Sequence, residues 1–494
     1  MKRYKRFIGR EAELDFLNGK YNSDKGELIV LYGRRRIGKT ELLNHFSQDK
    51  PCVFYSCSQS LDRVQLRKFS EQMFTQDLPA RRYISEFSDW EEAFRSIAEL
   101  PFKEKKKLVI IDEFPYMCRG NSSVPSILQN LWDHTLRDEN VMLVLCGSSM
   151  SFMEKEILSE KSPLYGRATG IYKMLPLSFY ESIQFFPQFS AEDKFMAYAI
   201  LGGVPQYLQQ FDDSRSLKDN ITDHILSKGA PLYNETEFLL RQELRETAAY
   251  NSIITALAMG STKLNEISQK SLVDNTAKTS VYLSSLIELG IVEKEFSINT
   301  KRKAKISPSK ASYQLADHFF KFWYAFVFPF QSELELGNTD EVYSLYIENN
   351  LNHFASHAFE LVCQSFMREL RRYGRTPFKF FEIGKWEGKT TVREPSAEKG
   401  YAAANTEIDI MAVDPERKQF ILGECKYRNT PFSYSEYLNF MTKLSPEKNS
   451  GEFYYMLFSK LGFDPKISET DHLKLFTLED IVLAKDPGHP LASE

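Results

Sequence analysis

The segment from Gly33 to Thr40 carries the residue spacing of a phosphate-binding loop. Gly33 is followed after four residues by Gly38, Lys39 and Thr40, and the loop stands between the apolar run LIVLY and a helix-favouring stretch. Glycines let backbone N–H groups turn toward a phosphate, a lysine ammonium reaches terminal phosphates, and a threonine hydroxyl can ligate Mg²⁺. We therefore predict an ATP site formed by Gly33, Arg34, Arg35, Arg36, Ile37, Gly38, Lys39, Thr40 and Glu41, with Thr40 as a metal ligand.

Two adjacent acids, Asp112 and Glu113, follow a second apolar run, LVII. An aspartate at the end of such a strand can hold the magnesium ion of a nucleotide, and a glutamate beside it can polarise an attacking water. Solvated acids that merely cap a strand are the alternative for either residue alone. Because the phosphate-loop pattern accompanies them, we predict Asp112 as a metal and nucleotide ligand and Glu113 as a catalytic residue.

Two further segments supply candidate groups for the nucleotide site. The run VMLVLCGSS ends in small polar residues, of which Ser148 could sense a γ-phosphate or a water, although a tight turn would use the same residues. Arg167 lies in the glycine-flanked segment SPLYGRATG and could stabilise transition-state charge, in cis or from a neighbouring subunit. A solvated loop arginine is the alternative.

A third set of chemically suited residues lies near the carboxyl end of the chain. Asp409, Glu424 and Lys426 stand in two short apolar segments that flank the polar turn DPERK. Two carboxylates that face each other repel unless a cation lies between them. We predict that Asp409 and Glu424 bind Mg²⁺ and that Lys426 approaches a phosphate or an attacking water. The alternative is a structural lysine–carboxylate pair across the strands.

Apolar runs predict the elements that position these residues. Continuous apolarity before Gly33, Asp112 and Ser148 is typical of parallel strands buried on both faces, whose carboxyl ends form the ligand edge of a sheet. Near the carboxyl end, a turn centred near Glu416 predicts an antiparallel hairpin that puts Asp409 within about one residue of Glu424.

The middle of the chain reads as helices followed by a hairpin. A short helix, a turn and a longer helix that stops at Gly290 give the order of a helix-turn-helix, and two strands with a basic tip follow. We predict a winged helix, with DNA contacts from Lys278, Thr279, Ser280, Lys301, Arg302, Lys303 and Lys305. A protein-docking or hinge module is the alternative. The aromatic segment HFFKFWYAFVFPF is predicted to be a buried helix.

Bulk composition limits the class of protein. The 494 residues contain 42% hydrophobic and 26% charged residues with a net charge of -4, which indicates several packed domains and no uniformly basic coat. Six scattered cysteines form no metal or disulfide pattern, and no apolar run is long enough to span a membrane. We expect a cytoplasmic protein with four domains, at residues 1–180, 181–238, 239–335 and 345–485.

The ordered motifs FIGREAEL, GRRRIGKTELL, LVIIDEF, CGSS, SPLYGRATG and LGGVPQYL resemble the archaeal-type ATPase family within the AAA+/STAND class of P-loop ATPases. The resemblance implies an α/β parallel-sheet ATPase core followed by a helical lid. It also implies that Phe7 to Glu13 pass near the base and that Pro205 contacts the nucleotide.

The Asp409…Glu424-x-Lys426 pattern resembles the PD-(D/E)xK nuclease fold, in which Glu360 would be the acidic residue of the first helix. Related ATPases carry such a restriction-endonuclease-like α/β domain at the carboxyl end. We therefore predict an ATP-binding, Mg²⁺-dependent ATPase coupled to a nuclease domain that acts on or binds DNA or another nucleic acid, with a homo-oligomer or a protein partner as further possibilities. The alternative is a STAND-type regulatory switch whose last domain docks or binds nucleic acid without catalysis.

Overall fold

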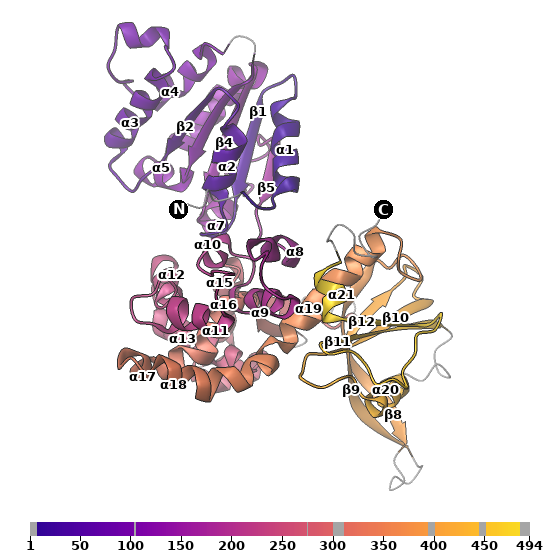
Figure 1. Ribbon diagram of the computed structural model, residues 1–494. Helices are drawn as coiled ribbons and strands as arrows, with labels where there is room; N and C mark the ends of the chain where they lie inside the picture. Colours follow the sequence, from indigo (N-terminus) through magenta and orange to yellow (C-terminus); the bar gives the residue numbers. More distant parts are fainter. Residues whose placement is uncertain are drawn as a thin grey trace. The chain divides into compact units, whose positions relative to one another are not determined.

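The computed structural model describes residues 7–102, 105–273, 275–299, 311–393, 401–443 and 451–484 (Figure 1). The chain separates into two compact units. Residues 1–177 with 204–206 form the first unit, and residues 178–203 with 207–494 form the second. In the described ranges, no helix has both the length and the apolar character that a membrane crossing requires. The residues predicted to form the wing, Lys301, Arg302, Lys303 and Lys305, lie outside the described residues.

The first unit is built on a five-stranded sheet in which every pair of neighbouring strands is parallel. The strand order is β2-β3-β4-β1-β5, so β4 lies between β1 and β3. The strands are β1 (Glu27–Tyr32), β2 (Cys52–Ser56), β3 (Lys107–Asp112), β4 (Val141–Gly147) and β5 (Gly170–Lys173). Strands β1 and β4 are buried along their full length, which confirms the parallel α/β core expected from continuous apolar runs.

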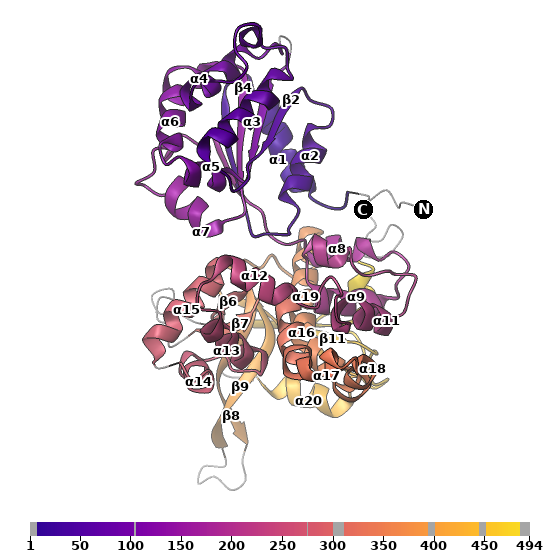
Figure 2. The same cartoon turned by 90° about the vertical axis from the view of Figure 1, so that its left-hand side faces the viewer.

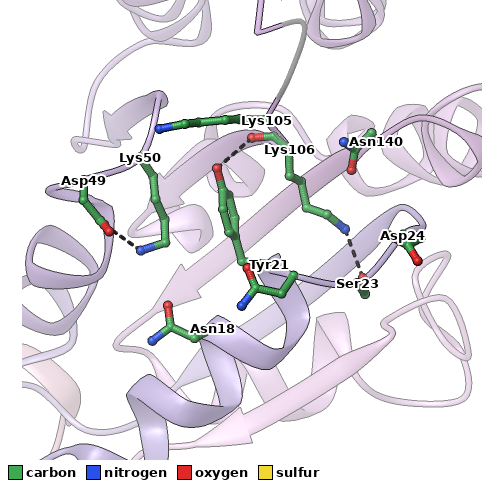
Figure 3. Close-up of a pocket in the computed structure, with 10 residues that line it drawn as sticks. Asn18, Tyr21, Ser23, Asp24, Asp49, Lys50, Lys105, Lys106 and Asn140 are labelled. Carbon is green, nitrogen blue, oxygen red and sulfur yellow. Dashed lines mark hydrogen bonds and ion pairs between the residues drawn. The ribbon is translucent and has the colours of Figure 1, made fainter.

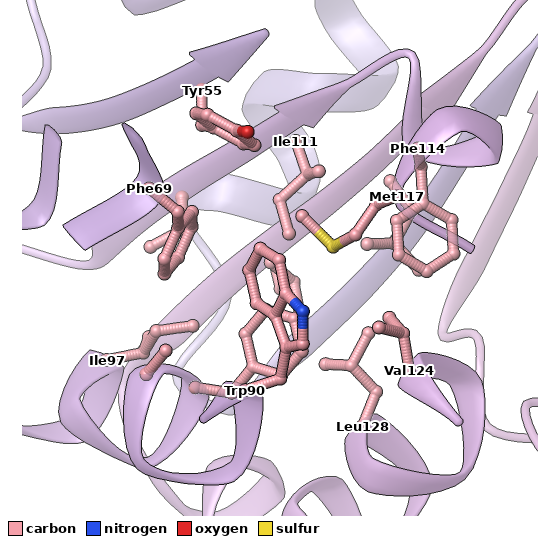
Figure 4. Packing of buried hydrophobic residues seen from close by; sticks show 14 of the residues in the cluster. Tyr55, Phe69, Trp90, Ile97, Ile111, Phe114, Met117, Val124 and Leu128 are labelled. Carbon is pink, nitrogen blue, oxygen red and sulfur yellow. The ribbon is translucent and has the colours of Figure 1, made fainter. Parts of the chain in front are cut away.

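Helices cover both faces of this sheet (Figure 2). They are α1 (Glu11–Tyr21), α2 (Lys39–Ser47), α3 (Asp62–Phe74), α4 (Trp90–Arg95), α5 (Phe114–Gly120), α6 (Val124–His134) and α7 (Met150–Phe152). On one face, Phe69 and Trp90 belong to a large aromatic core with Ile111 of β3 (Figure 4). On the other face, Ile110 packs with Leu42 from α2. Alternate residues of one strand thus serve two cores, which explains its unbroken apolar sequence.

The first part of the second unit is mainly helical. Its elements are α8 (Phe179–Ser182), α9 (Ala191–Leu201), α10 (Pro205–Leu208), α11 (Leu217–Ile221), α12 (Glu235–Glu243), α13 (Thr247–Ala258), α14 (Leu264–Lys270), α15 (Thr276–Glu288), β6 (Val292–Glu295), β7 (Ser312–Leu315), α16 (His318–Phe326), α17 (Gln331–Glu335) and α18 (Thr339–Val342). Helix α10 begins with residues that cluster with the first unit. Strands β6 and β7 pair antiparallel.

Helix α16 lies in the middle of this helical part, between α9 and α13. Its side chains Phe319, Phe320, Phe322, Trp323 and Tyr324 have no exposed surface. The Trp323 indole donates a hydrogen bond of 2.7 Å to the Tyr233 carbonyl, so its polar atom is satisfied. The prediction that this aromatic segment is a buried helix is confirmed.

The last part of the second unit is a long helix and a mixed sheet. Its elements are α19 (Leu351–Arg372), β8 (Glu382–Arg393), β9 (Tyr401–Val413), β10 (Gln419–Lys426), α20 (Tyr434–Lys443), β11 (Glu452–Ser459), β12 (Leu473–Thr477) and α21 (Leu478–Val482). The strand order is β12-β11-β10-β9-β8, with β8, β9 and β10 antiparallel and β10, β11 and β12 parallel. The predicted hairpin around Glu416 is therefore present as β9 and β10.

Both faces of the first sheet are buried, so the same Ile→Ala substitution should lower the free energy of unfolding more in a central strand than in an edge strand. Ile110 has no exposed surface, whereas Ile171 on the edge strand β5 is 53% exposed. We expect Ile110→Ala to lower the free energy of unfolding by about 2–5 kcal/mol, because it leaves a cavity between strand and helix. Ile171→Ala should cost about 0.5 kcal/mol or less. Urea unfolding of the two variants tests this, and equal midpoints would contradict it.

Candidate functional site

Strand order gathers the predicted nucleotide-binding residues at one edge of the first sheet. Gly33 follows β1, Asp112 ends β3, and Ser148 follows β4, which pairs with both of these strands. Because all three strands are parallel, their carboxyl ends meet at the same edge, where open α/β sheets bind ligands. Three segments that are far apart in sequence therefore converge on one site.

The phosphate loop is shaped by two glycines. A Cβ atom on Gly33 would lie 2.5 Å from the Met174 carbonyl oxygen, so no larger residue fits there. Gly38 has φ 87°, a conformation that favours glycine, and α2 begins at the next residue. Lys39 is buried, and its Nζ donates hydrogen bonds of 2.9 Å to the carbonyls of Gly33 and Arg34. The lysine is thus folded over the loop whose N–H groups would receive a phosphate.

The predicted metal ligands lie in direct contact. Thr40 Oγ1 donates a hydrogen bond of 2.7 Å to Asp112 Oδ2. Asp112 is buried, and its second oxygen accepts a hydrogen bond of 3.0 Å from the Glu113 amide. Burial lowers the pKa of the nearby Lys39 ammonium, while the neighbouring acids oppose that shift. A hydroxyl and a carboxylate side by side are oxygen ligands of the kind that Mg²⁺ uses at a nucleotide.

Glu113 adopts an unusual backbone conformation at the start of α5. Its φ is 54°, in the left-handed region that a residue with a side chain rarely adopts. The Ser148 hydroxyl donates a hydrogen bond of 2.8 Å to Glu113 Oε2. Strained backbone of this kind costs about 1–3 kcal/mol and is concentrated at functional sites. Ser148 thereby orients the carboxylate predicted to act on water.

Arg10 supports the phosphate loop and was not among the predicted site residues. This buried arginine donates hydrogen bonds of 2.9 Å to the Ile37 carbonyl, 2.8 Å to the Leu175 carbonyl and 2.7 Å to Glu13. Its own φ of 70° turns the chain from the FIGREAEL segment into α1. Only the motif resemblance pointed to this segment, because an arginine near a chain end is most often solvated.

The remaining predicted ATP-site residues occupy or border the same loop. Arg34 and Ile37 are buried, Arg35 Nη2 donates a hydrogen bond of 3.3 Å to the Tyr116 hydroxyl, Arg36 has φ 71°, and Glu41 is exposed on α2. Pro205, which clusters with the first unit, has its Cγ 3.8 Å from the position that a Cβ on Gly38 would take. The structure therefore brings Pro205 to the end of the phosphate loop.

Arg167 is the exception among the residues predicted for nucleotide hydrolysis. It lies just before β5, next to the amino half of β1, whereas the phosphate loop follows the carboxyl end of β1. Its Nε donates to both Asp133 oxygens at 3.0 Å, and its Nη2 donates to one of them at 2.8 Å. The prediction that Arg167 acts at the nucleotide site of its own unit is therefore wrong. The direction of the strands and the ion pair with Asp133 hold the side chain away from the phosphate loop.

A polar cavity of ≈ 650 Å³ lies near the amino ends of β1 and β3 (Figure 3). Lys106 from its lining donates hydrogen bonds of 2.6 Å to the Lys25 carbonyl and 3.0 Å to the Ser23 hydroxyl. Lys50, also in the lining, pairs with Asp49 at 2.7 Å. These lysines are engaged with the protein, and the cavity is separated from the phosphate loop by the length of the strands.

The second predicted site lies where β9 meets β10. The register pairs Ile410 with Gly423, so Asp409 and Glu424 follow as the next opposed positions. Asp409 Oδ2 accepts a hydrogen bond of 2.8 Å from the Cys425 amide. Burial first, and then the charges of Glu424 and Glu360, raises the pKa of Asp409 to about 7. The predicted acids are thus close enough to interact.

Lysines neutralise the second carboxylate of this site. Glu424 is buried, and its two oxygens accept hydrogen bonds of 2.8 Å from Lys426 and 2.7 Å from Lys443. Lys443 comes from α20 and was not predicted, because nothing in the local sequence places that helix against β10. Each oxygen of Glu424 thus already accepts one ammonium hydrogen bond, and a metal ion would share this carboxylate with the two lysines.

The predicted DNA-facing residues of α15 divide between surface and core. Lys278 is exposed at the start of the helix, and Ser280 is partly buried. Thr279 has no exposed surface, and its hydroxyl donates a hydrogen bond of 3.0 Å to the Asn275 carbonyl. The prediction that Thr279 faces a groove is therefore wrong, since it lies on the helix face that packs inward.

The parallel sheet and the loop, acid and serine at its carboxyl edge define a P-loop ATPase. Residues 7–211 match a family described as "ATPase domain predominantly from Archaea", and residues 323–438 match one described as "Archaea bacterial proteins of unknown function". An uncharacterised protein of Methanocaldococcus jannaschii, MJECL04, is 31% identical over 423 residues, which cover 86% of this chain and 88% of the relative. The chain belongs to the family of this relative, and its first unit is an archaeal-type ATPase domain.

Solved structures show weaker likeness. The Walker-type ATPase PABY2304 of Pyrococcus abyssi is 20% identical with a TM-score of 0.47, over 65% of this chain and 97% of that one. The ORC2 protein of Aeropyrum pernix is 13% identical with a TM-score of 0.41, over 68% of this chain and 97% of that one. Both TM-scores lie below 0.5, so the family assignment rests on the sequence matches.

The raised pKa of Asp409 predicts that removing its charge increases the stability of the fold, by an amount that depends on pH. The folded state binds this proton more tightly than the unfolded chain, whose aspartate pKa is about 3.9, so stability decreases as pH rises between these two values. We expect Asp409→Asn to raise the Tm of the second unit at pH 8 and to change it much less at pH 4.5. Thermal unfolding measures this, with the exposed Asp471→Asn as the control. An equal effect at both pH values would contradict it.

Proposed function

We propose that the chain is a Mg²⁺-dependent ATP hydrolase whose nucleotide state controls a metal-dependent nuclease domain acting on DNA. The ATPase part rests above all on one observation: the Ser148 hydroxyl holds the left-handed Glu113 at the edge where Lys39, Thr40 and Asp112 converge. A strained, oriented carboxylate beside a phosphate loop is suited to position a water for attack on a γ-phosphate.

Each residue around the phosphate loop has a separate role in ATP hydrolysis. The loop N–H groups and Lys39 bind the terminal phosphates, and Pro205 lies at the end of the same loop. Thr40 and Asp112 would hold Mg²⁺, which neutralises phosphate charge when bound. Glu113 orients the attacking water and accepts its proton, while Ser148 keeps the carboxylate aligned. Arg10 fixes the loop through the Ile37 carbonyl.

Contacts between β9 and β10, two inner strands of the second sheet, support the nuclease part of the proposal. Asp409 and Glu424 oppose each other, Lys426 follows on the same strand, and Glu360 contributes to the field at Asp409. Two oxygen ligands with a neighbouring ammonium can bind a divalent ion and approach a phosphodiester. Their sheet, with an antiparallel β8–β9–β10 part preceded by α19, has the element order expected of a nuclease-like domain.

DNA binding by a winged helix belongs to the same proposal. Helices α13, α14 and α15 are followed by the antiparallel strands β6 and β7, the order expected for that module. Lys278 is exposed near the start of α15, where a recognition helix contacts phosphates or base edges. An approach of this helix to DNA would place the second unit on nucleic acid.

One observation favours the alternative, a STAND-type ATP-driven switch with a non-catalytic last domain. Both oxygens of Glu424 are engaged by lysines, at 2.8 Å and 2.7 Å. A buried carboxylate neutralised in this way is stable without a metal ion. In that case ATP would regulate docking or nucleic-acid binding, and the lysines would serve the fold.

The geometry at Glu113 predicts a separation of ATP binding from hydrolysis. We expect Glu113→Gln to bind ATP with an affinity within about threefold of the parent and to hydrolyse it at least about 100-fold more slowly, because general-base assistance of this size is lost. Equilibrium binding of a fluorescent ATP analogue and phosphate release measure the two effects. The exposed Glu91→Gln on α4 serves as the matched control. Hydrolysis at the parental rate would contradict the assignment.

Lys426 provides the test of the nuclease. We expect the protein to nick supercoiled plasmid with Mg²⁺ or Mn²⁺, and Lys426→Ala to lose at least about 100-fold of that activity, since the charge near the reacting phosphate is gone. Lys418→Ala, in the exposed turn before β10, should keep it. Absence of metal-dependent nicking, with and without ATP, would contradict the nuclease and leave the ATP-driven switch as the function.

A further inference from the structure

A polar cavity of ≈ 390 Å³ lies in the second unit, and Glu360 is one of the residues that line it. Its lining comes from β6, β7, α19 and the start of β8. The hairpin β6–β7 thus faces the long helix that carries Glu360. Most of the charged side chains in the lining are acidic. Lys385, which also lines the cavity, pairs with Glu407.

Three metal-binding side chains meet in this cavity. Carboxylate oxygens of Glu293 and Glu295 and a ring nitrogen of His357 all lie within 4.8 Å of one another. The two glutamates are two residues apart on β6, so they lie on the same face of the strand, and His357 approaches from α19. One imidazole and two carboxylates are a ligand set for a divalent first-row transition ion.

The histidine itself provides an independent sign of a ligand. His357 Nε2 is buried and has no hydrogen-bond partner among the described residues. Its other nitrogen, Nδ1, lies 3.4 Å from Glu360 Oε2. Buried polar atoms are normally satisfied, and metal-bound histidines usually share the second ring nitrogen with a carboxylate or carbonyl. His357 therefore has one nitrogen oriented by a carboxylate and one available for a metal ion.

Charge around the cluster also suits a cation. Glu295 Oε2 accepts a hydrogen bond of 2.8 Å from Gln314 on β7, which leaves its second oxygen for other ligands. A bound divalent ion would offset the repulsion between the two carboxylates. Arg368 and Lys385 in the same lining are the opposing charges.

We propose that Glu293, Glu295 and His357 bind one divalent transition-metal ion, such as Zn²⁺, Mn²⁺ or Co²⁺, which links β6 to α19. A nitrogen ligand disfavours Mg²⁺ and Ca²⁺, which prefer oxygen alone. The ion would connect strands β6 and β7, and the helices α13, α14 and α15 before them, to helix α19, which carries Glu360. This site goes beyond the proposed nuclease, because none of its three ligands is a predicted nuclease residue.

Metal titration of the full-length protein tests the site. Co²⁺ is added in the presence of excess Mg²⁺, which occupies oxygen-only sites, and binding is followed by visible absorption and by equilibrium dialysis. We expect about one equivalent to bind, and His357→Ala to weaken it at least about tenfold, since even the loss of an outer-shell partner costs about 10- to 100-fold. His353→Ala, exposed one turn earlier on α19, should bind as the parent does.

Two further variants test the ligand set. Glu293→Gln keeps the size of the side chain and should also weaken Co²⁺ binding, whereas Asp471→Asn, at an exposed position, should leave it unchanged. Circular dichroism confirms that each variant is folded. Absence of Co²⁺ binding to the parent, or equal binding by His357→Ala, would overturn the proposal, whatever the outcome of the plasmid assay.

Discussion

Parallel pairing of β4 with both β1 and β3 is the constraint on which the nucleotide site depends. It places the loop that begins at Gly33, the acid at Asp112 and the hydroxyl of Ser148 at the carboxyl edge of the sheet, where open α/β sheets bind ligands. The burial of both sheet faces keeps this arrangement rigid, since neither face can shift without opening a core. The left-handed Glu113 is tolerated because this scaffold and Ser148 hold it.

Buried carboxylates are stabilised by different partners in the two units. At the phosphate loop, Asp112 accepts a hydrogen bond from the Thr40 hydroxyl, and the Lys39 ammonium donates hydrogen bonds to loop carbonyls. Where β9 pairs with β10, lysines donate hydrogen bonds to both oxygens of Glu424, while Asp409 accepts one hydrogen bond from a backbone amide. The first arrangement leaves its charges available for a nucleotide. In the second, a metal ion would share Glu424 with two lysine ammonium groups.

Sequence patterns predicted much of the fold, for physical reasons that differ between elements. Continuous apolar runs identified the buried parallel strands, and the turn around Glu416 set the β9–β10 pairing. The sequence predicted that Thr279 faces DNA, but the structure buries it. The prediction was wrong because the residues around Thr279 do not show which face of the helix packs inward. Arg167 has a suitable loop sequence, yet its position before β5 and its pairing with Asp133 depend on strand order.

The sequence by itself determined the chemistry of the phosphate loop, because strand, glycine turn, lysine and helix are contiguous and their geometry is local. It also determined that Asp409 and Glu424 would face each other, because a short hairpin links them. Only the tertiary structure decided the partners that come from distant segments: Ser148 for Glu113, Arg10 for the Ile37 carbonyl, and Lys443 for Glu424. Such contacts depend on strand order and helix packing, which no local pattern encodes.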